Sequence, residues 1–423
     1  MEQMRRMGRR SFVLGAAGTV AALVTAGDAV ARPGPAARPG PPAVRRAAAA
    51  ELRGVWIGTV GNLDWPSKAG LTAAAQQAEL VAHLDRAVEL RLNAVVLQVR
   101  PTADALWPSP HEPWAECLTG TQGKDPGWDP LGTAVKEAHA RGLELHAWFN
   151  PYRVANHTDP ARLNASHPAR VHPDWVLPYG GKLYYNPGLP EVRKFVQDAM
   201  LDAVGRYDVD AVHWDDYFYP YPVAGQTFDD DTAYARHGSA FPNKAAWRRD
   251  NIDRLVRETA ERITGLKKDV RFGISPFGVW RNAATDPLGS DTRGGVQTYD
   301  DLHADTRKWV KEGWIDYIAP QVYWEIGNSA ADYGKLVAWW DTTVRGTGVD
   351  LYIGEALYKC GDPAQPAAWQ DPAELSRHLD LADGHDGVDG HIFFSAKHAK
   401  TDPTGALARV VADHYQVRAR TPR

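Results

Sequence analysis

The chain has 423 residues, of which 44% are hydrophobic and 24% are charged, a composition typical of a globular protein with a sizeable core. Its formal net charge is -4 at pH 7, which is small for this length and argues against a nucleic-acid-binding surface. The 16 tryptophans are an unusually high number. Many of them should fill the core, but large flat side chains also suit a ligand with flat apolar faces, such as a sugar ring.

The first 31 residues have the pattern of an export signal. Arg9 and Arg10 precede Ser11 and Phe12, as in a twin-arginine signal, and residues 29–31 (Ala-Val-Ala) fit the A-x-A cleavage pattern. The apolar stretch 12–26 is short and rich in Ala and Gly, which disfavours a membrane anchor. We therefore predict a signal peptide over 1–31. The bacterial protein would be secreted, or stay at the cell envelope, after export by the twin-arginine route.

Residues 32–50 are rich in Pro, Gly and Ala and lack hydrophobic periodicity, which predicts a linker. The rest of the sequence contains no segment long and apolar enough to span a bilayer. Cys117 and Cys360 could form one disulfide in an oxidising location. We expect one folded domain over 51–423.

Short apolar runs alternate with amphipathic, helix-like stretches along this domain. Continuous apolar strands that alternate with helices indicate parallel strands covered on both sides, and eight such units favour a (β/α)8 TIM barrel. A doubly wound open sheet is the alternative, but it usually shows a Gly-rich phosphate loop after its first strand, which residues 58–67 do not supply. The predicted strands are 52–60, 94–99, 143–149, 209–214, 270–275, 315–324, 351–354 and 391–394.

The segments that follow predicted strands two to five are long and rich in aromatic residues and proline. They cover roughly 101–128, 150–189, 217–245 and 276–300. In this fold the strand-to-helix loops build the active-site face. We therefore expect a walled cleft on the C-terminal face of the barrel, which suits a polymeric substrate.

The stretch "HWDDYFYP" (213–220) places two carboxylates at the C-terminal end of the fourth predicted strand. Asp215 and Asp216 are adjacent, so the repulsion between their like charges should make their two pKa values different. One protonated acid and one anion are the pair that glycosidic cleavage needs. The alternative is a pair of loop aspartates that caps the next helix, but the strand-end position and aromatic surroundings favour function.

Other polar residues follow the strands on the same face. His213 shares the strand face of Asp215, where it would either bond that carboxylate or line the barrel. A metal site with His146, His213 and the aspartates is disfavoured, because the first strand lacks the histidine pair of barrel metallohydrolases; no metal or cofactor is expected. The further strand-end candidates are Arg100, Asp104, Asn150, Arg153, Gln321, Tyr323, Trp324, Glu325, Glu355, Lys397 and His398.

Several blocks resemble one known family, in the family's order. They include "ELRGVWIGTVGNLDWPS", "NAVVLQVRPTADALWPS", "HAWFNPYR", "HWDDYFYP", "FGISPFGVWRN" and "IDYIAPQVYW". Over about 51–410 the chain resembles the glycosyl-hydrolase-like family 10 of bacterial envelope proteins. The resemblance implies a (β/α)8 glycosidase that acts on an envelope polysaccharide, with peptidoglycan glycan strands stripped of their peptides as the favoured substrate.

A second resemblance, to retaining hexosaminidases and chitinase-like enzymes, suggests a mechanism. In them the 2-acetamido group of the substrate attacks the anomeric carbon, so no enzyme nucleophile is needed. The resemblance implies that Asp215 orients the acetamido group, that Asp216 is the acid and that Tyr323 bonds the acetamide. The chain must then bend at 215–216, since neighbouring strand residues point opposite ways. In the competing mechanism Asp215 is a nucleophile, and Glu325 or Glu355 is the acid.

The remaining candidates, which include His213, Gln321 and Glu325, are assigned to substrate binding. Sugar hydroxyls or carboxyls would be bonded by Arg100, Asp104, Asn150, Arg153 and Asn186, and sugar faces would stack on Trp107, Trp148, Tyr217, Trp280 and Trp324. Two other functions remain open. One is a hydrolase of a different polysaccharide, and the other is a glycan-binding barrel that has lost catalysis.

Overall fold

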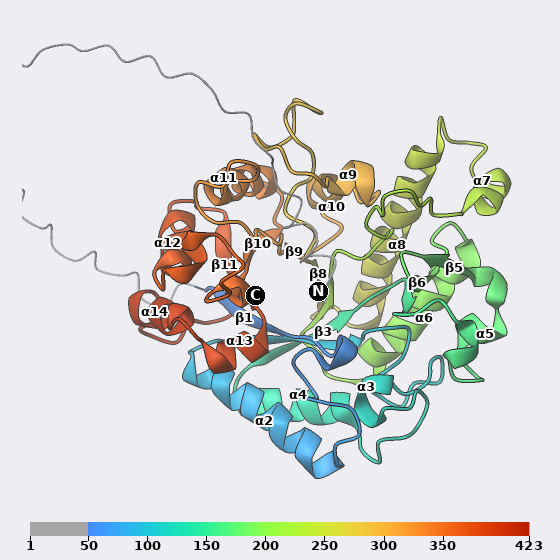
Figure 1. The fold of residues 1–423 in the computed structure, drawn as a ribbon, viewed down its shortest axis with the longest axis horizontal. Coiled ribbons are helices and arrows are strands. Elements are labelled where there is room, and N and C mark those ends of the chain that lie inside the picture. The colour runs from blue at the N-terminus through green and yellow to red at the C-terminus, as the bar shows by residue number, and fades with distance from the viewer. Residues whose placement is uncertain (1–49, 423) are drawn as a thin grey trace, which may run out of the picture. The chain divides into compact units, whose positions relative to one another are not determined.

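The computed structural model describes residues 50–422, so the predicted signal peptide (1–31) and almost all of the predicted linker (32–50) lie outside the described residues. Eight parallel strands close into a barrel in the order β1-β11-β10-β9-β8-β7-β3-β2 (Figure 1). This confirms the predicted (β/α)8 barrel. The strands are β1 (Leu52–Ile57), β2 (Ala94–Arg100), β3 (Glu144–Phe149), β7 (Ala211–Trp214), β8 (Arg271–Ile274), β9 (Tyr317–Ile318), β10 (Asp350–Glu355) and β11 (Val388–Phe394).

Helices follow the strands and surround the barrel (Figure 1). Several begin at a polar side chain that accepts a backbone N–H of the first turn: Thr72 before α2, Asp129 before α4 and Asn243 before α8. The helices of this layer are α2 (Ala73–Glu89), α4 (Pro130–Ala140), α6 (Pro190–Arg206), α8 (Lys244–Leu266), α10 (Thr306–Lys311), α11 (Tyr333–Val344), α12 (Glu374–Ala382), α13 (Ala396–Thr401) and α14 (Ala406–Asp413).

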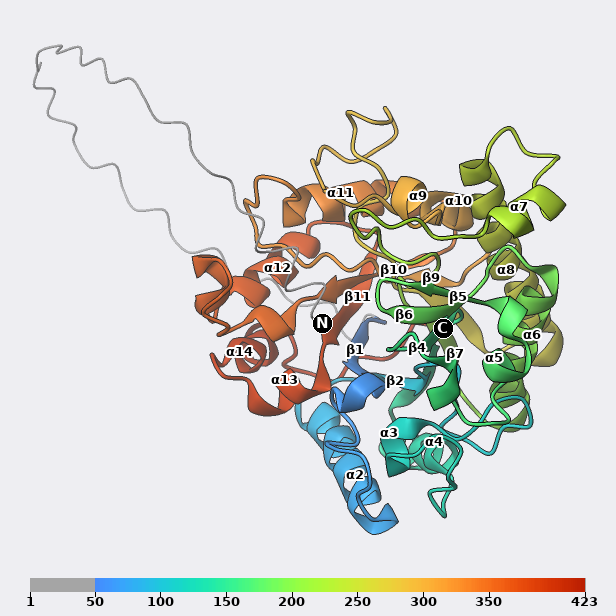
Figure 2. The same ribbon diagram turned by 45° about the vertical axis from the view of Figure 1, so that its right-hand side comes forward.

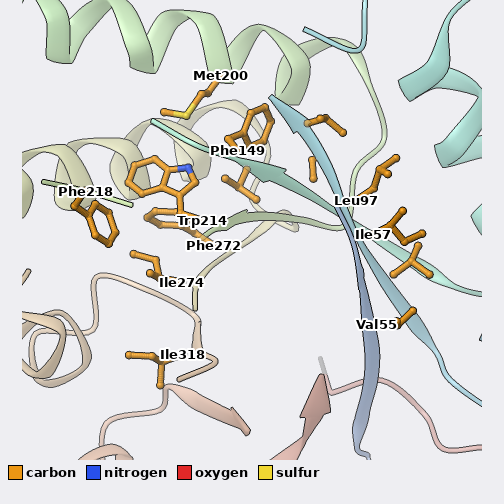
Figure 3. Close-up of a cluster of buried hydrophobic side chains, with 14 of the residues drawn as sticks. Val55, Ile57, Leu97, Phe149, Met200, Trp214, Phe218, Phe272, Ile274 and Ile318 are labelled. Carbon is orange, nitrogen blue, oxygen red and sulfur yellow. The ribbon is translucent and has the colours of Figure 1, made fainter. Parts of the chain in front are cut away.

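Two sets of buried side chains fill the barrel and its surroundings. Outward-facing strand residues such as Phe149 and Trp214 pack beside Met200 of α6, between the strands and the helices (Figure 3). Inward-facing residues form a second cluster that includes Trp56, Tyr317 and Tyr352. The interior of the barrel is therefore a packed core and not a channel.

The long strand-to-helix segments carry small elements of their own. The segment after β3 holds a three-stranded antiparallel sheet in the order β4-β6-β5 (Figure 2). The connections from helix to strand on the opposite face are short, as between α6 and β7. The additional elements are α3 (Glu116–Thr119), β4 (Arg153–Ala155), α5 (Pro168–Val171), β5 (Val176–Tyr179), β6 (Lys182–Tyr185), α7 (Asp231–His237) and α9 (Thr298–Asp301), with short 3-10 turns at 60–62, 160–162, 173–175, 357–359 and 367–370.

The sixth predicted strand, 315–324, is much shorter in the structure. It pairs with its neighbours only over β9, Tyr317–Ile318. Pro320 lacks the N–H that a continued ladder needs, and beyond it only Gln321 forms isolated bridges, to Phe277 and Gly354. Residues 319–324 therefore belong to the rim of the barrel, where they carry several candidate site residues.

Two smaller predictions can also be compared with the structure. Cys117 and Cys360 are both buried free thiols, so they do not form the disulfide that the sequence left open. Among residues 50–422, no helix is long and apolar enough to cross a membrane.

Candidate active site

The two adjacent aspartates lie where β7 reaches the mouth of the barrel. The strand ends at Trp214, and the chain bends at Asp216, so the two carboxyl groups need not point to opposite sides as they would within a strand. The side chains are almost buried, with Asp215 5% and Asp216 7% exposed. The bend that the proposed roles require is therefore present.

Asp215 is held by a chain of amides that begins at the backbone of the segment after β1. The Oε1 atom of Gln98 accepts the N–H groups of Thr59 and Val60, both at 2.9 Å. Its Nε2 must then donate to Oδ1 of Asn150, at 2.6 Å, and Nδ2 of Asn150 donates to Oδ2 of Asp215, also at 2.6 Å. Since a backbone N–H can only donate, the direction of every bond in this chain is determined.

Arg153, on β4, supports the same side of the site. Its Nη2 donates to Oδ1 of Asn150 at 3.0 Å, and its Nε donates to the carbonyl of Pro101 at 3.1 Å. The guanidinium carbon lies 4.8 Å from the centre of the Tyr217 ring. Arg153 thus brings positive charge to the aspartates and packs on the aromatic residue that follows them.

Asp216 faces the other side of the site. The hydroxyl of Tyr221 donates to its Oδ2, and Nε2 of Gln321 donates to its Oδ1 at 3.1 Å. Tyr221 belongs to a row of rings that we call the aromatic wall: Tyr217, Tyr221, Phe277 and Trp324. Successive ring centres along the wall are 5.7, 6.2 and 5.3 Å apart. A wall of rings beside a carboxyl group suits the faces of a sugar chain.

The environment raises the pKa of both aspartates. Burial is the largest cause for Asp215, the charge of Asp216 adds to it, and the opposing charge of Arg153 leaves a pKa of about 7. Burial also raises the pKa of Asp216, while the hydrogen bonds from Tyr221 and Gln321 oppose the rise. Two neighbours that both have a raised pKa can hold one proton between them, as glycosidic cleavage would require, and the division into acid and anion stays a prediction.

Tyr323 follows β9, close to the pair. Its side chain is 8% exposed, and burial raises its pKa well above the ordinary value. The ring lies between Tyr358 and Phe394, with centres 5.7 and 6.3 Å away. Within the described part of the chain its hydroxyl has no hydrogen-bond partner, so it remains a neutral donor for a ligand.

Two predicted substrate contacts are wrong because the side chains are fully buried. Arg100 forms an ion pair with Glu112 at 2.5 Å and donates to the carbonyls of Asn150 and Pro151. Trp107 packs on Phe149 and donates to Asp202 of α6 at 2.8 Å. Neither side chain has any exposed surface, so both support the site from behind.

His213 is also not a substrate contact, and it does not bond Asp215. Inside the barrel its Nε2 accepts from the indole of Trp56 at 3.1 Å, and its Nδ1 lies 2.9 Å from the hydroxyl of Tyr317. That hydroxyl also reaches Nδ1 of His146 at 3.0 Å, and Nε2 of His146 bonds Glu144 at 3.0 Å. We call this series the interior chain. Both histidines of the disfavoured metal site therefore form hydrogen bonds within the interior chain.

The other candidates lie apart from the aspartates or have partners of their own. Glu355 faces the helices α11 and α12, and its pKa is lowered to about 2, so it cannot be the acid of the competing mechanism. Trp148 lines the barrel interior at 6% exposure. Roles in sugar binding remain predictions for the following residues, each with its present partner: Asp104 (Thr102, Glu116 and Gln122), Asn186 (Gly188), Trp280 (Asp305) and Glu325 (Asn328 and Trp369).

The sequence analysis missed two residues that contact the site directly or through one neighbour. Gln98 lies within an apolar strand, on the inward face that it shares with Ala94 and Val96. An amide at an inward position near the C-terminal end of a strand was the signal that could have identified it. Tyr221 is one of four rings in a short stretch, and the sequence does not show which of them reaches Asp216.

The chain is similar to proteins that are named as glycosyl hydrolases. The chain is 51% identical over 374 residues to the glycosyl hydrolase YngK of Bacillus subtilis (strain 168), covering 88% of this chain and 73% of that protein. It is 42% identical over 380 residues to the glycosyl hydrolase DigH of Escherichia coli (strain K12), covering 85% and 86%.

Two solved structures share the fold at low sequence identity. The glycoside hydrolase domain of PgaB (BpsB) from Bordetella bronchiseptica has a TM-score of 0.53 at 14% identity, covering 86% of this chain and 99% of that one. The catalytic domain of the beta-amylase from Paenibacillus polymyxa has a TM-score of 0.54 at 9% identity, covering 88% and 99%. These two structures show the shared barrel fold, and the family supports a glycosidase. The family model "Glycosyl hydrolase-like 10" matches residues 51–371, and the chain belongs to that family.

Proposed function

We propose that this protein is an exported bacterial glycoside hydrolase that cleaves an envelope polysaccharide, namely peptidoglycan glycan strands without their peptides. The observation that carries the proposal is the pair of buried, adjacent carboxyl groups at the end of β7. The amide of Asn150 holds one of them, and the aromatic wall borders the other. The raised pKa of both groups supplies the shared proton that glycosidic cleavage needs.

The substrate is inferred from chemistry and from the export pattern. Rings in a row beside the aspartates suit a chain of sugars, and a twin-arginine signal would place the enzyme where wall glycan is found. Each sugar of peptidoglycan carries a 2-acetamido group. Such a group can serve as the internal nucleophile, and the site offers residues to orient it.

The proposed reaction begins with the transfer of a proton from Asp216 to the glycosidic oxygen. The acetamido oxygen attacks the anomeric carbon as the bond to the leaving sugar breaks, which forms a cyclic oxazolinium. Asp215, fixed by Asn150, accepts the acetamido N–H and balances the positive charge, and Tyr323 donates to the acetamido oxygen. Water, deprotonated by Asp216, then opens the ring with net retention.

The test of the function compares substrates. Residues 51–423, as wild type and as Asp216→Asn, are incubated with amidase-stripped peptidoglycan glycan and with starch, and soluble products are identified by mass spectrometry. Acetamido-sugar fragments from the wild type alone are the expected result. Release of fragments from starch but not from wall glycan would contradict the substrate. Retained glycan binding without products from either substrate would indicate a binding protein.

A separate experiment tests the role of Asp215. A 2-fluoro glycoside without the acetamido group traps enzymes that use a carboxylate nucleophile, because it slows the breakdown of the covalent intermediate. We expect no covalent adduct by intact-protein mass spectrometry. An adduct that maps to Asp215 would contradict substrate assistance and support the competing mechanism.

A further inference from the structure

A concave region lies on the C-terminal face, apart from the two aspartates. It is a cavity of about 310 Å³ between the segments that follow β1, β2 and β3. Polar and charged side chains make up much of its lining, among them Asp104, which the sequence predicted to bind sugar hydroxyls. The lining excludes the two aspartates and the aromatic wall. The lining residues used below are Val60, Ala69, Pro101, Glu116, His157 and Arg162.

The cavity shares backbone with the support of Asp215. The N–H of Val60 donates to Gln98, which begins the amide chain to the aspartate. The carbonyl of Pro101 accepts from Arg153, which bonds Asn150. Two of the segments that line the cavity therefore also hold the groups that position Asp215. The cavity and the aspartates lie on neighbouring parts of one rim.

Among residues 50–422, several polar groups of the cavity have no hydrogen-bond partner. The Nδ1 atom of His157 is buried without a hydrogen-bond partner in the part of the chain that the structure describes. Over the same residues, the side chains of Glu116 and Arg162 form no hydrogen bond. The cavity therefore offers a carboxylate that can accept hydrogen bonds, a guanidinium that can donate them and a ring nitrogen without a partner. This combination fits a ligand with many hydroxyl groups.

The strand order places this cavity and the aromatic wall on opposite sides of the aspartates. Around the barrel, β7 lies between β8 and β3, and β2 and β1 follow β3. The rings of Phe277 and Trp324 follow β8 and β9, and the cavity is built after β3, β2 and β1. A sugar chain that crosses the aspartates would thus meet rings on one side and the polar cavity on the other.

We infer that the cavity is a distal sugar subsite, so that the enzyme grips a glycan on both sides of the scissile bond and cuts it internally. The inference rests on the proposed function and adds its mode of action. Binding energy from the distant sugar would be used to place the scissile bond on the aspartates. Long glycans should therefore be cut faster than short ones, and the first products should be long fragments.

The experiment measures kcat/KM on stripped glycan strands and on the shortest acetamido-sugar oligosaccharide that the enzyme cleaves. Ala69 is exposed and lines the cavity, so Ala69→Trp fills it, and Lys68→Trp is the matched control on an exposed neighbour outside the lining. We expect the ratio of long- to short-substrate kcat/KM to fall about tenfold in Ala69→Trp and to stay unchanged in Lys68→Trp. Arg162→Ala, at an exposed side chain, should lower the ratio of long- to short-substrate kcat/KM about threefold.

The outcomes separate this inference from the proposed function. If the wild type cleaves glycan but both cavity variants keep its ratio, the subsite is wrong and the function stands. Release of only mono- or disaccharides from the start of the reaction would also overturn the inference. Absence of products from every acetamido-sugar substrate would contradict the proposed function, and both proposals would fall.

Discussion

Two buried carboxylate sites occur at the C-terminal ends of barrel strands, and their surroundings are opposite. Glu355, at the end of β10, accepts from Tyr333 at 2.7 Å and bonds His378 at 2.8 Å and His391 at 3.0 Å. Burial alone would raise its pKa, but the charge and hydrogen bonds of the histidines lower it to about 2. Asp215, equally buried, has another carboxylate as its neighbour, and its pKa rises to about 7.

The direction of the side chain explains the difference. Along β10, Tyr352 points into the barrel, so Glu355 points outward, where α11 and α12 supply partners. Asp215 continues the inward face of His213 and reaches the mouth of the barrel, where the opposing charge that acts on it within residues 50–422 is that of Arg153. Both carboxylates are thus buried at strand ends, and Asp215 alone of these two has uncompensated charge that faces the mouth, which is the feature that favours the proposed catalytic role.

The largest expected effect is on turnover. Asp215→Asn should lower kcat about a thousandfold, because the amide cannot balance the charge that forms at the anomeric centre, while KM changes by less than about threefold. Glu355→Gln should retain kcat within about threefold per folded molecule. Steady-state kinetics on stripped glycan provide the measurement. Equal losses in the two variants would remove the distinction between the sites.

The second effect is on the stability of the protein. Here the substitution of Glu355 should have a larger effect than the substitution of Asp215. Glu355→Gln leaves His378 without its main counter-charge and should cost about 3 kcal/mol, read from urea unfolding at about pH 5.5. The Glu355 contribution is present above the unfolded pKa of 4.5 and is lost as pH falls toward about 2.

Deprotonation of His378 limits the stability cost of Glu355→Gln at high pH. Although burial opposes it, the charge of Glu355 raises the pKa of His378, so this contribution is complete below 6.5 and is lost as pH rises through the folded pKa. The cost of Glu355→Gln should therefore be greatest between pH 4.5 and 6.5. Glu89→Gln, at an exposed glutamate, should cost less than about 0.5 kcal/mol. A cost independent of pH would argue against the ion pair.

A smaller effect concerns the residue that positions Asp215 through Asn150. Gln98→Glu keeps the acceptor for Thr59 and Val60 but cannot donate to Asn150, whose amide should turn its oxygen toward Asp215. We expect kcat to fall about tenfold to a hundredfold, and the alkaline limb of the pH profile to move to higher pH.

Two further variants separate this role from folding. Gln98→Met removes the amide without adding a charge. It should lower kcat without moving the alkaline limb of the pH profile to higher pH. Gln197→Met removes a buried amide of α6, which contacts Glu258 and Arg262, and should leave kcat unchanged after correction for the folded fraction. Wild-type kinetics in both Gln98 variants would show that the amide chain does not act on Asp215.

The smallest expected effect is on the stability of the protein and concerns the ionisation of Asp215. The raised pKa of Asp215 means that the folded state holds its proton more tightly than the unfolded chain, so its ionisation destabilises the fold as pH rises from about 4 to about 7. Asp215→Asn should therefore stabilise the protein by about 1–2 kcal/mol at about pH 8 and by almost nothing at about pH 4. Thermal unfolding at both pH values provides the measurement, and destabilisation at the higher pH would contradict the raised pKa.

The sequence predicted the architecture well because it depends on pattern. The apolar runs, their alternation with amphipathic stretches and the long loops after strands two to five each identify an element without knowledge of its neighbours. The aspartate pair was found for the same reason, since the end of an apolar run is visible in the sequence.

Contacts between distant segments were much harder to predict. Trp107 and Asn150 both follow a strand, yet one packs against α6 and the other bonds Asp215, because the path of the chain after the strand decides which way each points. Gln98, on β2, belongs to the site through hydrogen bonds to Thr59, which follows β1, and to Asn150, which follows β3. The histidine partners of Glu355 come from β11 and α12, so its neutralisation could not be read from its local sequence.

The interior chain has a consequence for spectroscopy. Because the Trp56 indole can only donate, Nε2 of His213 must be bare, and the proton of this ring sits on Nδ1. The Tyr317 hydroxyl accepts from that N–H and donates its own proton to Nδ1 of His146, whose proton then sits on Nε2 toward Glu144. The two rings thus play opposite roles at the Tyr317 hydroxyl, since Nδ1 of His213 donates to it and Nδ1 of His146 accepts from it. Their ¹⁵N chemical shifts would report whether the barrel interior is intact without any assay of turnover.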